Sequence, residues 1–360
     1  MSLPRRLLVL GVSHHRTPLD IRELFSLNNE DVRALAERLL ATEGIDEVVL
    51  LNTCNRVEAY LAGESEPDPE KVLQAMAEVT GQPLDLLRDL HYSAGNSDML
   101  VHLFSVASGL DSQMIGETEI LGQVKESLVR ARNEKWVGKR MGPLFERSFQ
   151  AAKWARTHTG IGQGQVTIGN VVVDLVSRVF GDLVRPRILL VGSGEVAEKT
   201  AQSLASRGAR DITVTGRSFD RAEALARTFN GAVLPFETFR ENLHLYDIII
   251  CSTASPEPLL TQETVREISG RRRYSPLLLV DVAVPRDVEA SVGSLNQVFL
   301  YNMDDLADIA NENLRLREQE VESCLAELKR RAWRTWLRSI RRSFGSKLAA
   351  RSRGKIEDSP

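Results

Sequence analysis

The sequence predicts an α/β and α+β multidomain protein, and three observations lead to this fold class. The chain has 360 residues, which is more than one typical domain contains. Segments with the periodicity of strands and of helices alternate at the beginning and again in the middle of the chain. The last part is a long, charged, helix-like stretch without strands. We predict an N-terminal α/β domain over residues 1–160, a linker helix and a second α/β domain over 161–303, and a helical segment over 304–360.

Composition argues against several classes of protein. Hydrophobic residues make up 42% of the chain and charged residues 26%, as in ordinary globular proteins. A formal net charge of -3 argues against nucleic-acid binding driven by the charge of the whole molecule. No apolar run approaches the roughly 20 residues that a membrane span needs, and the N-terminus lacks a secretory signal. The three scattered cysteines, Cys54, Cys251 and Cys324, suit a reducing compartment, so we expect a cytoplasmic protein without disulfides.

In the first domain, short apolar runs predict strands, and apolar residues at helical spacing predict helices. The strands are expected at 7–12, 48–51 and 57–61. A helix is expected at 28–40, because Val32, Leu35, Ala36 and Leu39 recur on one face. Helices are then expected to dominate from 70 to 184, with members at 98–109, 119–135, 142–157 and 166–180. The last of these is expected to connect the two α/β domains.

One turn of the first domain contains a cysteine in an unusual setting. The predicted strand at 48–51 leads into Asn52-Thr53-Cys54-Asn55-Arg56, so the thiol lies among small polar residues. A thiol at a strand end can face a cleft, and a guanidinium two residues away can lower its pKa or hold an anionic substrate. A lone cysteine is also often structural, and from the residues alone both interpretations stay open. Cys251 ends an apolar strand and is expected to be buried and inert, and Cys324 lies in the long helix with no activating neighbour evident.

The second α/β domain begins with a fully apolar strand at 188–191, which is typical of a parallel sheet covered on both faces. A glycine-containing turn follows, and then a helix expected at 195–207. Gly192 allows the tight turn, and Gly194 lets a pyrophosphate approach the helix N-terminus. This pattern predicts a Rossmann-type dinucleotide site formed by Gly192, Ser193, Gly194, Glu195, Val196 and Ala197. The alternative is a glycine turn in an α/β domain without a ligand.

Further strands at 211–215, 247–251 and 277–281, with a helix at 221–229, are expected to complete a doubly wound sheet. The end of the strand at 211–215 indicates the cofactor. Arg217 can pair with a 2′-phosphate and Ser218 can donate a hydrogen bond to it, which favours NADP(H) over NAD(H). Arg217 can equally be an exposed loop charge. The small polar run from Ser252 to Ser255 suits a nucleotide crevice and an ordinary turn about equally.

Residues 108–125, between two predicted helices, are rich in small and polar side chains. Ser112, Glu117 and Gln123 supply donors and acceptors that can line a cleft. Thr118 or Glu119, by contrast, can simply begin the next helix.

The histidines by themselves point to no metal site. His102 lies on a predicted helix face among apolar residues, which alone is typical of a partly buried histidine. His14 and His15 are adjacent, so on a strand they are expected to point to opposite faces. No Cys/His spacing resembles a zinc site, and we predict no metal.

The stretch from 304 to about 338 is expected to be one long helix with a narrow apolar seam. A lone long helix is rarely stable, so the seam predicts a partner chain. It is formed by Leu314, Val321, Leu325 and Leu328. From Lys329 to Lys355 no acidic residue interrupts the basic ones. A solvated tail is the first interpretation, and an RNA-facing patch with Trp333 and Trp336 as stacking groups is the second.

These motifs together resemble one family, glutamyl-tRNA reductase, the first committed enzyme of the five-carbon route to tetrapyrroles. The resemblance extends to about residue 338 and lies in the runs Gly11–Pro18, Asn52–Glu58, Ala107–Ser112, Ile120–Lys125 and Asp281–Val288. It implies that the first domain is catalytic, that the second binds NADPH, and that the C-terminal segment forms a homodimer. The other implied partners are glutamyl-tRNA and a glutamate-1-semialdehyde aminomutase.

The resemblance also implies roles for individual residues. Cys54 takes the glutamyl group as a thioester, which NADPH reduces to glutamate-1-semialdehyde. His102 polarises the carbonyl or moves a proton, and Arg56 binds a substrate carboxylate. The implied substrate contacts are Thr53, Asn55, Arg56, Ser112, Glu117, Thr118, Glu119 and Gln123.

Two departures from the family pattern stand out. The family usually has Gln at the position of Glu119, and its members often carry a longer C-terminal dimerisation domain.

Two other functions compete with the one implied: a non-covalent NADPH oxidoreductase of the shikimate-dehydrogenase kind, and a non-catalytic paralogue that binds tRNA or dinucleotide. A trapped glutamyl-enzyme adduct discriminates between them.

Overall fold

The computed structural model describes residues 6–159, 161, 167–272, 276–312 and 318–354, with side chains of the last helix described over 320–340. The chain divides into two compact units. Unit 1 comprises Met1–Pro18, Leu27–Gly164 and Leu316–Pro360, and unit 2 comprises Leu19–Ser26 and Gln165–Arg315. The segment predicted as a third part, 304–360, is therefore shared between the two units.

Unit 1 is built on a four-stranded antiparallel sheet in the order β2-β3-β1-β4. Its strands are β1 (Leu7–Ser13), β2 (Glu47–Asn52), β3 (Arg56–Ala62) and β4 (Tyr92–Gly95). Every residue of β1 and β3 is buried, which explains the mostly apolar sequence of β1; β3 buries two charged residues, Arg56 and Glu58, as well. β4 was not predicted. Its sequence, Tyr-Ser-Ala-Gly, carries little strand signal, and it forms by pairing with β1 at the sheet edge.

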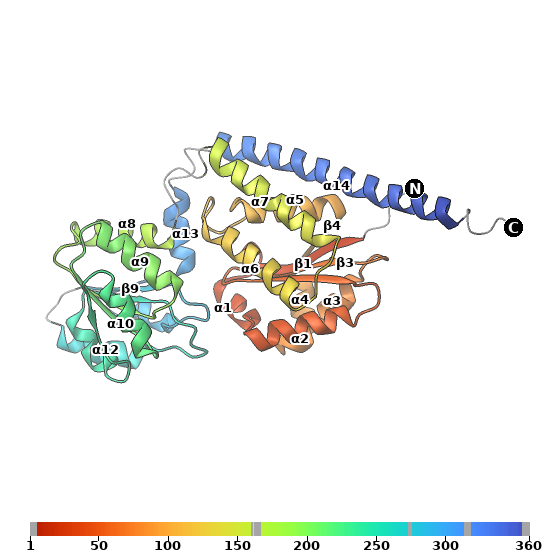
Figure 1. Cartoon of the computed structure of the whole chain (residues 1–360). Helices are drawn as coiled ribbons and strands as arrows, with labels where there is room; N and C mark the ends of the chain where they lie inside the picture. Colours follow the sequence, from red (N-terminus) through yellow and green to blue (C-terminus); the bar gives the residue numbers. More distant parts are fainter. Residues whose placement is uncertain (1–5, 160, 162–166, 273–275, 313–317, 355–360) are drawn as a thin grey trace. The chain divides into compact units, whose positions relative to one another are not determined.

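Helices cover both faces of this sheet (Figure 1). α2 (Asn29–Leu40), α3 (Pro69–Thr80) and the short α4 (Leu84–Leu90) lie on one side, and α5 (Asn96–Ala107), α6 (Glu119–Asn133) and α7 (Met141–His158) follow later in the chain. Local chemistry explains the helix starts. The Asn28 side chain accepts the N–H groups of Glu30 and Asp31, and Asp31 bonds back to the Asn28 N–H. Pro69 begins α3 directly after the capping residue Asp68.

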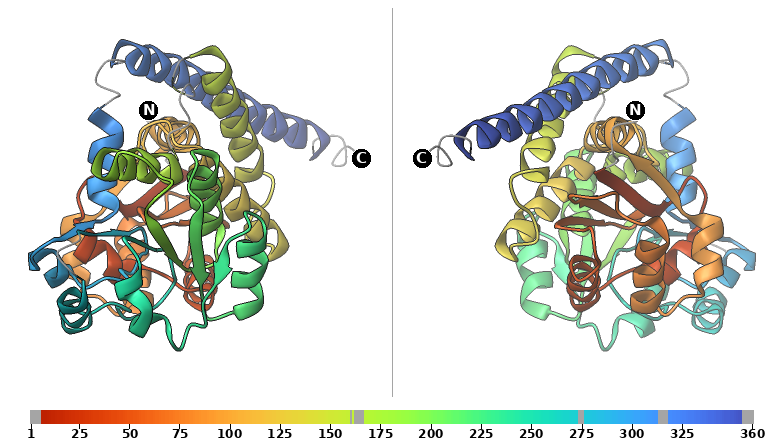
Figure 2. Two further views of the ribbon diagram at one scale, coloured as in Figure 1. Left: turned by 90° about the vertical axis from the view of Figure 1, so that its left-hand side faces the viewer. Right: turned by 90° about the vertical axis from the view of Figure 1, so that its right-hand side faces the viewer.

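The long helix α14 (Glu318–Gly354) packs on α5 and α7 of its own unit, as the turned views also show (Figure 2). Cys324, Leu328 and Ala332 are fully buried there, and the Arg331 guanidinium lies 4.4 Å from the centroid of the Trp154 ring. The sequence predicts that a partner chain covers the apolar seam. At Leu328, helices of the same chain cover it instead. Leu314 lies outside the described residues.

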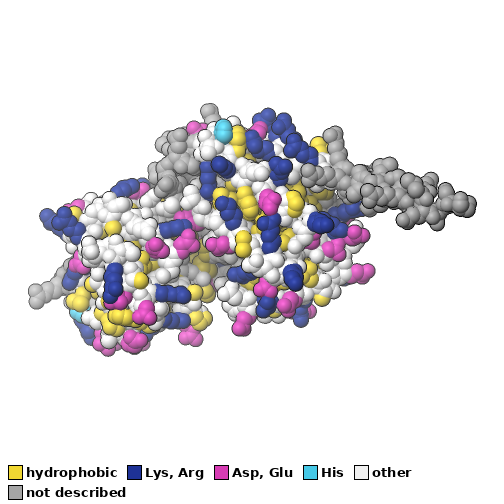
Figure 3. Space-filling view, viewed as in Figure 1, with side chains coloured by type: hydrophobic (Ala, Val, Ile, Leu, Met, Phe, Trp, Pro, Cys, Tyr) yellow, Lys and Arg dark blue, Asp and Glu magenta, His cyan; other side chains and the backbone are white. Residues whose placement is uncertain are grey.

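The solvent side of α14 carries cations and two apolar side chains. Lys329, Arg330, Arg334 and Arg338 are exposed, and half of Trp333 is exposed. Figure 3 shows Lys and Arg side chains also on the side of unit 1 formed by α6 and α7, with acidic side chains among them. An RNA-facing role for α14 stays a prediction.

Unit 2 contains a six-stranded parallel sheet in the order β10-β9-β8-β5-β6-β7. The strands are β5 (Arg187–Val191), β6 (Asp211–Thr215), β7 (Ala232–Val233), β8 (Ile248–Cys251), β9 (Leu277–Asp281) and β10 (Val298–Tyr301). Because β5 lies between β6 and β8, the chain changes direction across the sheet at β5. A crevice for a ligand is expected at the carboxyl end of such a strand.

Helices pack on the sheet of unit 2 according to the alternation of its side chains. Leu189, Val191, Ile249 and Leu279 share one buried cluster with the short helix α11 (Phe239–Asn242) and with α12 (Gln262–Arg271). The remaining helices are α1 (Leu19–Arg22), α8 (Ile168–Phe180), α9 (Glu195–Ser206), α10 (Phe219–Arg227) and α13 (Met303–Glu312), with 3-10 turns at Glu23–Phe25, Leu243–Leu245 and Ala290–Ser294. Within the described ranges, no helix is both long and apolar enough to cross a membrane.

The predicted helix from 304 to 338 is two helices that belong to different units. α13 packs on α8 and β10 in unit 2, whereas α14 packs in unit 1. Local periodicity continues through both helices, but the surfaces that bury their apolar residues are different. The boundary therefore depends on tertiary packing that a sequence pattern does not contain.

Candidate functional site

The hairpin between β2 and β3 ends in the turn Thr53-Cys54-Asn55, which carries the candidate nucleophile. Thr53 Oγ1 accepts the N–H groups of Asn55 (3.2 Å) and Arg56 (3.1 Å), and the Thr53 N–H donates to the Arg56 carbonyl (2.9 Å). The Asn55 carbonyl in turn accepts the N–H of His14 at the end of β1 (3.0 Å). Cys54 lies at the tip of this well-bonded turn and is half-buried. Thr53 therefore stabilises the turn through its side chain, and its predicted contact with a substrate stays a prediction.

Glu58 is the centre of a buried network beside this turn. Because side chains alternate along a strand, Arg56, Glu58 and Tyr60 share one face of β3. Glu58 Oε1 accepts from Arg56 Nη1 (2.7 Å), and Oε2 accepts from the Tyr60 hydroxyl (2.6 Å). Burial alone would raise the pKa of the Glu58 carboxyl, but Arg56 and His102 outweigh it and hold that pKa well below its usual range. Glu58 is thus an ionised, fully buried acceptor.

Gly11 makes room for this network. In the sheet register Gly11 lies between Glu58 on β3 and Tyr92 on β4. The Tyr92 hydroxyl donates to Glu58 Oε1 across it. A Cβ atom at position 11 would lie 2.3 Å from the Val57 carbonyl oxygen and 2.9 Å from Glu58 Cγ. Only glycine at this position lets β1 lie under the Glu58 side chain.

The sequence-predicted His102 belongs to the same network. It lies on α5, and its Nε2 is 2.9 Å from Glu58 Oε1. An ionised carboxylate only accepts hydrogen bonds, so Nε2 carries a proton. This contact fixes the orientation of the imidazole ring and leaves Nδ1 as the nitrogen that can exchange a proton.

Arg56 is brought to the site but is almost fully buried, with 3% of its surface exposed. Its Nη1 donates to Glu58 and, at 2.8 Å, to Asp111 Oδ2, and its Nη2 donates to the Asp111 carbonyl. Burial opposes the charge of Arg56, but these acids outweigh it and raise the pKa of the guanidinium. Part of the charge that the sequence assigned to a substrate carboxylate is therefore already paired inside the protein.

The loop between α5 and α6, together with the first turns of α6, supplies the other predicted substrate residues. Ser112 and Glu117 are buried, and Thr118, Glu119 and Gln123 are half-buried. Burial raises the pKa of the Glu117 carboxyl to about 7, partly opposed by the Ser112 hydroxyl. Glu119 Oε2 accepts the Thr118 N–H at 3.2 Å. The main chain of this loop is held by Arg156, whose Nη2 lies 3.4 Å from the Glu117 carbonyl oxygen and 3.3 Å from that of Thr118.

His14 and His15 lie in the turn after β1, and the prediction that they point to opposite faces is wrong. β1 ends at Ser13, so strand alternation no longer applies, and the two rings are 4.1 Å apart between centroids. His15 Nε2 lies 3.3 Å from Asp111 Oδ1. This hydrogen bond and Arg56 lower the pKa of Asp111 to about 2 although burial opposes them.

Unpartnered polar atoms border the network. Ser13 Oγ, Asn55 Oδ1 and Ser108 Oγ are buried and make no hydrogen bond among the residues that the structure describes. Buried polar atoms without a partner are costly, and a bound polar molecule is one way to satisfy them. They mark the surroundings of the Cys54 turn as suited to a polar ligand.

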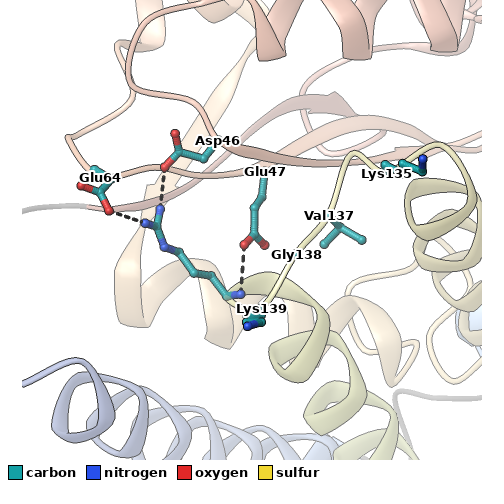
Figure 4. A pocket seen from close by; sticks show the side chains of 8 residues that line it. Asp46, Glu47, Glu64, Lys135, Val137, Gly138 and Lys139 are labelled. Atoms are coloured by element: carbon teal, nitrogen blue, oxygen red, sulfur yellow. Dashed lines mark hydrogen bonds and ion pairs between the residues drawn. The ribbon is translucent and has the colours of Figure 1, made fainter. Parts of the chain in front are cut away.

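A cavity of about 500 Å³ lies at the other end of the β2–β3 hairpin and is lined by charged residues (Figure 4). Arg140 bonds to Asp46 at 2.7 Å and to Glu64 at 2.9 Å. Glu47 accepts the N–H groups of Arg140 and Met141 and so caps α7. The carboxylates of this cavity thus already have partners within the protein, and none of the predicted site residues lines it.

The glycine turn of unit 2 fits a dinucleotide. Gly192 has φ 123 and its N–H donates to the Thr215 carbonyl (2.8 Å); a Cβ there would lie 2.8 Å from the Ser252 carbonyl oxygen. A Cβ at Gly194 would meet no atom within 4 Å, so the N-terminus of α9 is open for a pyrophosphate. Ser193 precedes the N-cap residue Gly194, Glu195 and Val196 begin the helix, and Ala197 is buried. Arg217 and Ser218 are exposed at the carboxyl end of β6.

Two family models match the chain, one in each unit. The family model for the N-terminal domain of glutamyl-tRNA(Glu) reductase matches residues 10–159, and the model for shikimate/quinate 5-dehydrogenase matches 174–309. A glutamyl-tRNA reductase of Saccharophagus degradans is 38% identical over 316 residues, which are 88% of this chain and 74% of that protein. The chain belongs to the glutamyl-tRNA reductase family. The resemblance and the fold class predicted from the sequence are thereby confirmed.

Other members of the glutamyl-tRNA reductase family show the same extent of similarity. The protein of Akkermansia muciniphila is 36% identical over 322 residues, 89% of this chain and 94% of that protein. The solved structure of the Methanopyrus kandleri enzyme has a TM-score of 0.51 and 34% identity, and covers 96% of this chain and 83% of that chain. As in dehydrogenases of this kind, unit 2 is a nicotinamide dinucleotide-binding domain.

Sequence reasoning missed four residues of the network beside the Cys54 turn, namely Glu58, Tyr60, Tyr92 and Asp111. One signal was available: Glu58 is an acid inside an otherwise apolar strand, two residues after Arg56. A charge in such a place must be paired. The predicted burial of Cys251 is confirmed; Cys324 is fully buried as well, and burial raises the pKa of both thiols. Within the described ranges, no group of three or more His, Cys, Asp or Glu side chains is placed to hold a metal ion.

Proposed function

We propose that this chain catalyses the NADPH-dependent reduction of glutamyl-tRNA to glutamate-1-semialdehyde through a thioester on Cys54. The observation that carries the proposal is the Cys54 turn, which lies beside the buried Arg56–Glu58–His102 network in a domain of the glutamyl-tRNA reductase family. Family membership supports this function over a non-covalent shikimate-dehydrogenase-like activity and over a non-catalytic paralogue.

In the first step, the thiolate of Cys54 attacks the carbonyl carbon of the glutamyl ester. The new C–S bond forms, the bond from that carbon to the ribose oxygen breaks, and the tRNA leaves with a proton on that oxygen. The glutamyl group stays on the protein as a thioester. The turn bonds of Thr53 hold Cys54 in place for this attack.

His102 is the proton carrier of the proposal. Because Nε2 donates a hydrogen bond to Glu58, Nδ1 is the nitrogen that exchanges a proton with the reacting oxygen or sulfur. The ring is kept in one orientation by Glu58 and lies near Tyr92, with 5.3 Å between ring centroids. Glu58 is therefore a positioning residue that acts through His102 and Arg56.

The glutamyl group offers an ammonium and a carboxylate to be bound. The ammonium suits the unpartnered Asn55 Oδ1 and the carboxylates of Glu117 and Glu119. A guanidinium has five N–H donors, so Arg56 retains donors for the substrate carboxylate beyond those that Glu58 and Asp111 accept. Ser112 and Gln123 complete the proposed contacts, and Thr118 contributes its backbone.

NADPH is the proposed cofactor, and when bound it supplies hydride to the thioester carbonyl carbon. The turn from Gly192 to Ala197 would hold its pyrophosphate at the N-terminus of α9. Arg217 and Ser218, both exposed beyond β6, would bind the 2′-phosphate that distinguishes NADPH from NADH.

A single assay tests the proposal. Incubation with glutamyl-tRNA and NADPH should yield glutamate-1-semialdehyde, and without NADPH a glutamyl adduct should accumulate on Cys54 and be seen by mass spectrometry. Cys54→Ser should abolish both, while the matched control Cys324→Ser, a buried thiol far along the chain on α14, should retain both. Semialdehyde formation by the Cys54→Ser protein would refute the covalent route.

The proposed partners beyond tRNA are a second copy of the chain and a glutamate-1-semialdehyde aminomutase. Support for a homodimer comes from the exposed Trp333 and Leu337 on the described part of α14. Light scattering of the full chain, with a Trp333→Ser variant beside it, measures whether this face joins two copies.

A further inference from the structure

A chain of hydrogen bonds connects the buried Asp287 to the exposed Arg217 in unit 2. The Asp287 carboxylate accepts the Thr253 N–H at 2.7 Å and the Thr253 hydroxyl. Thr253 Oγ1 in turn accepts the Ser255 N–H at 3.1 Å. The Ser255 hydroxyl then accepts Nη2 of Arg217 at 2.9 Å. Asp287 is fully buried and Ser255 is 3% exposed, so the anchor of this chain lies in the interior.

The last bond of this chain joins the two loops that flank β5. Arg217 follows β6 and Ser255 follows β8, and both strands pair with β5, on opposite sides. Both loops also abut the glycine turn after β5. A Cβ at Gly216 would lie 3.3 Å from Ser193 Oγ, and a Cβ at Gly192 would lie 2.8 Å from the Ser252 carbonyl oxygen. The guanidinium of Arg217 is therefore held beside the turn that fits a dinucleotide.

The direct partner of Arg217 is the neutral Ser255 hydroxyl, and this has a consequence for anion binding. A carboxylate in contact with Arg217 would neutralise its charge, whereas the Ser255 hydroxyl occupies one of its five N–H donors and leaves the charge for a ligand. An exposed arginine normally loses much side-chain freedom when it binds. A guanidinium already held by Ser255 loses less of that freedom and binds a phosphate more tightly.

We propose that Ser255, held in place by Thr253 and Asp287, is a positioning residue that sets Arg217 for the 2′-phosphate and so determines the preference for NADPH over NADH. The inference rests on the proposed function, because it assumes that Arg217 contacts this phosphate. It adds a determinant of selectivity on the loop after β8, at a distance in sequence from the loop that carries Arg217.

The test is a fluorescence titration of the full chain with NADPH and with NADH. Ser255→Ala should raise the Kd for NADPH about five- to tenfold, since one hydrogen bond is lost, and should leave the Kd for NADH unchanged. Arg217→Ala should raise the Kd for NADPH about ten- to a hundredfold. The double variant should bind NADPH no more weakly than Arg217→Ala alone, because Ser255 acts through Arg217.

Conservative variants and surface controls sharpen the result. Thr253→Ser keeps the hydroxyl that links Asp287 to Ser255 and should retain the NADPH preference, whereas Thr253→Val should reduce it. Ser206→Ala and Arg227→Ala, exposed at the ends of α9 and α10, should change neither Kd.

The outcomes separate this inference from the proposed cofactor. If Arg217→Ala weakens both dinucleotides equally, the 2′-phosphate contact itself is wrong. If Arg217→Ala is selective but Ser255→Ala changes nothing, tightens NADPH, or weakens both dinucleotides alike, the contact stands and the positioning role of Ser255 is overturned.

Discussion

Arg56 in unit 1 and Arg217 in unit 2 both lie next to a turn that carries a proposed site, yet they differ in burial and in partners. Arg56 is 3% exposed and bonds to the carboxylates of Glu58 and Asp111. Arg217 is exposed and bonds to the neutral hydroxyl of Ser255. The first charge is compensated within the protein, whereas the second is available to a ligand.

The difference teaches what each arginine contributes. A buried charge that loses its partner leaves the other charge uncompensated in a poorly solvated place, so Arg56 supports both the fold and the orientation of His102. An exposed arginine contributes little to stability but can contribute much to binding an anion. The same residue type is therefore part of a buried ion-pair network in one unit and the proposed recognition residue in the other.

Replacing each arginine by alanine is expected to give the largest contrast. Arg56→Ala leaves Glu58 buried without its main cation and should lower the free energy of unfolding of unit 1 by about 3–5 kcal/mol. Arg217→Ala should change stability by less than about 0.5 kcal/mol. All four tryptophans, Trp136, Trp154, Trp333 and Trp336, belong to unit 1, so their fluorescence in urea reports the unfolding of that unit alone.

Circular dichroism, which reports both units, serves as the second probe for Arg217→Ala. If the two variants lost the same stability, the charge of Arg56 would not be compensated within the protein any more than that of Arg217. A stable Arg56→Ala protein without activity would instead assign Arg56 to the substrate alone.

The site of unit 2 could be predicted more completely than that of unit 1, and the reason is the distance in sequence between the residues involved. The turn from Gly192 to Ala197 is a local pattern between a strand and a helix, so a short window of sequence contains it. The network around Glu58 joins residues from β3, β4 and α5 and the loop that follows α5. No local periodicity contains such contacts.

The same limit applies to the fold. The strands β1, β2, β3, β5, β6, β8 and β9 were predicted because each is a short run rich in apolar and β-branched residues. β4, and the division between α13 and α14, depend on the surfaces against which they pack. The chain Asp287–Thr253–Ser255–Arg217 is intermediate: its small polar run after β8 was noticed in the sequence, but its link to Arg217 crosses β5.

Gly11 in unit 1 and Gly194 in unit 2 differ in how closely other atoms surround them, and the expected effect of replacing them is smaller than for the arginines. Gly11→Ala places a Cβ 2.3 Å from the Val57 carbonyl oxygen, so the strands must shift, at a cost of about 1–3 kcal/mol in the tryptophan-detected unfolding of unit 1. Gly194→Ala meets open space and should leave unfolding by circular dichroism unchanged within about 0.5 kcal/mol, while weakening NADPH binding. Gly11→Ala without loss of stability would show that the Glu58–Tyr92 contact does not need a glycine beneath it.

The smallest expected effect is an acid-dependent one at Asp111. The pKa of this carboxyl is lowered to about 2 in the folded protein from an ordinary value of 3.8, so its contribution to stability is present above pH 3.8 and is lost as the pH falls toward 2. A quarter of the side chain is exposed, which reduces the contribution to about 1 kcal/mol. Asp111→Asn should therefore be less stable than the unchanged chain at pH 7, and only about a third of this gap should remain at pH 2.5, where Asp111 is still partly ionised.

Tryptophan-detected urea titrations at the two pH values measure this gap. Asp46→Asn is the matched control, because the ion pair of Asp46 with Arg140 is exposed and should contribute less than about 0.5 kcal/mol at either pH. A gap of the same size at pH 7 and pH 2.5 would mean that Asp111 stabilises unit 1 by packing and not by its charge. In that case Arg56 would depend on Glu58 alone for compensation, and the charge of Arg56 would be more available to a substrate carboxylate.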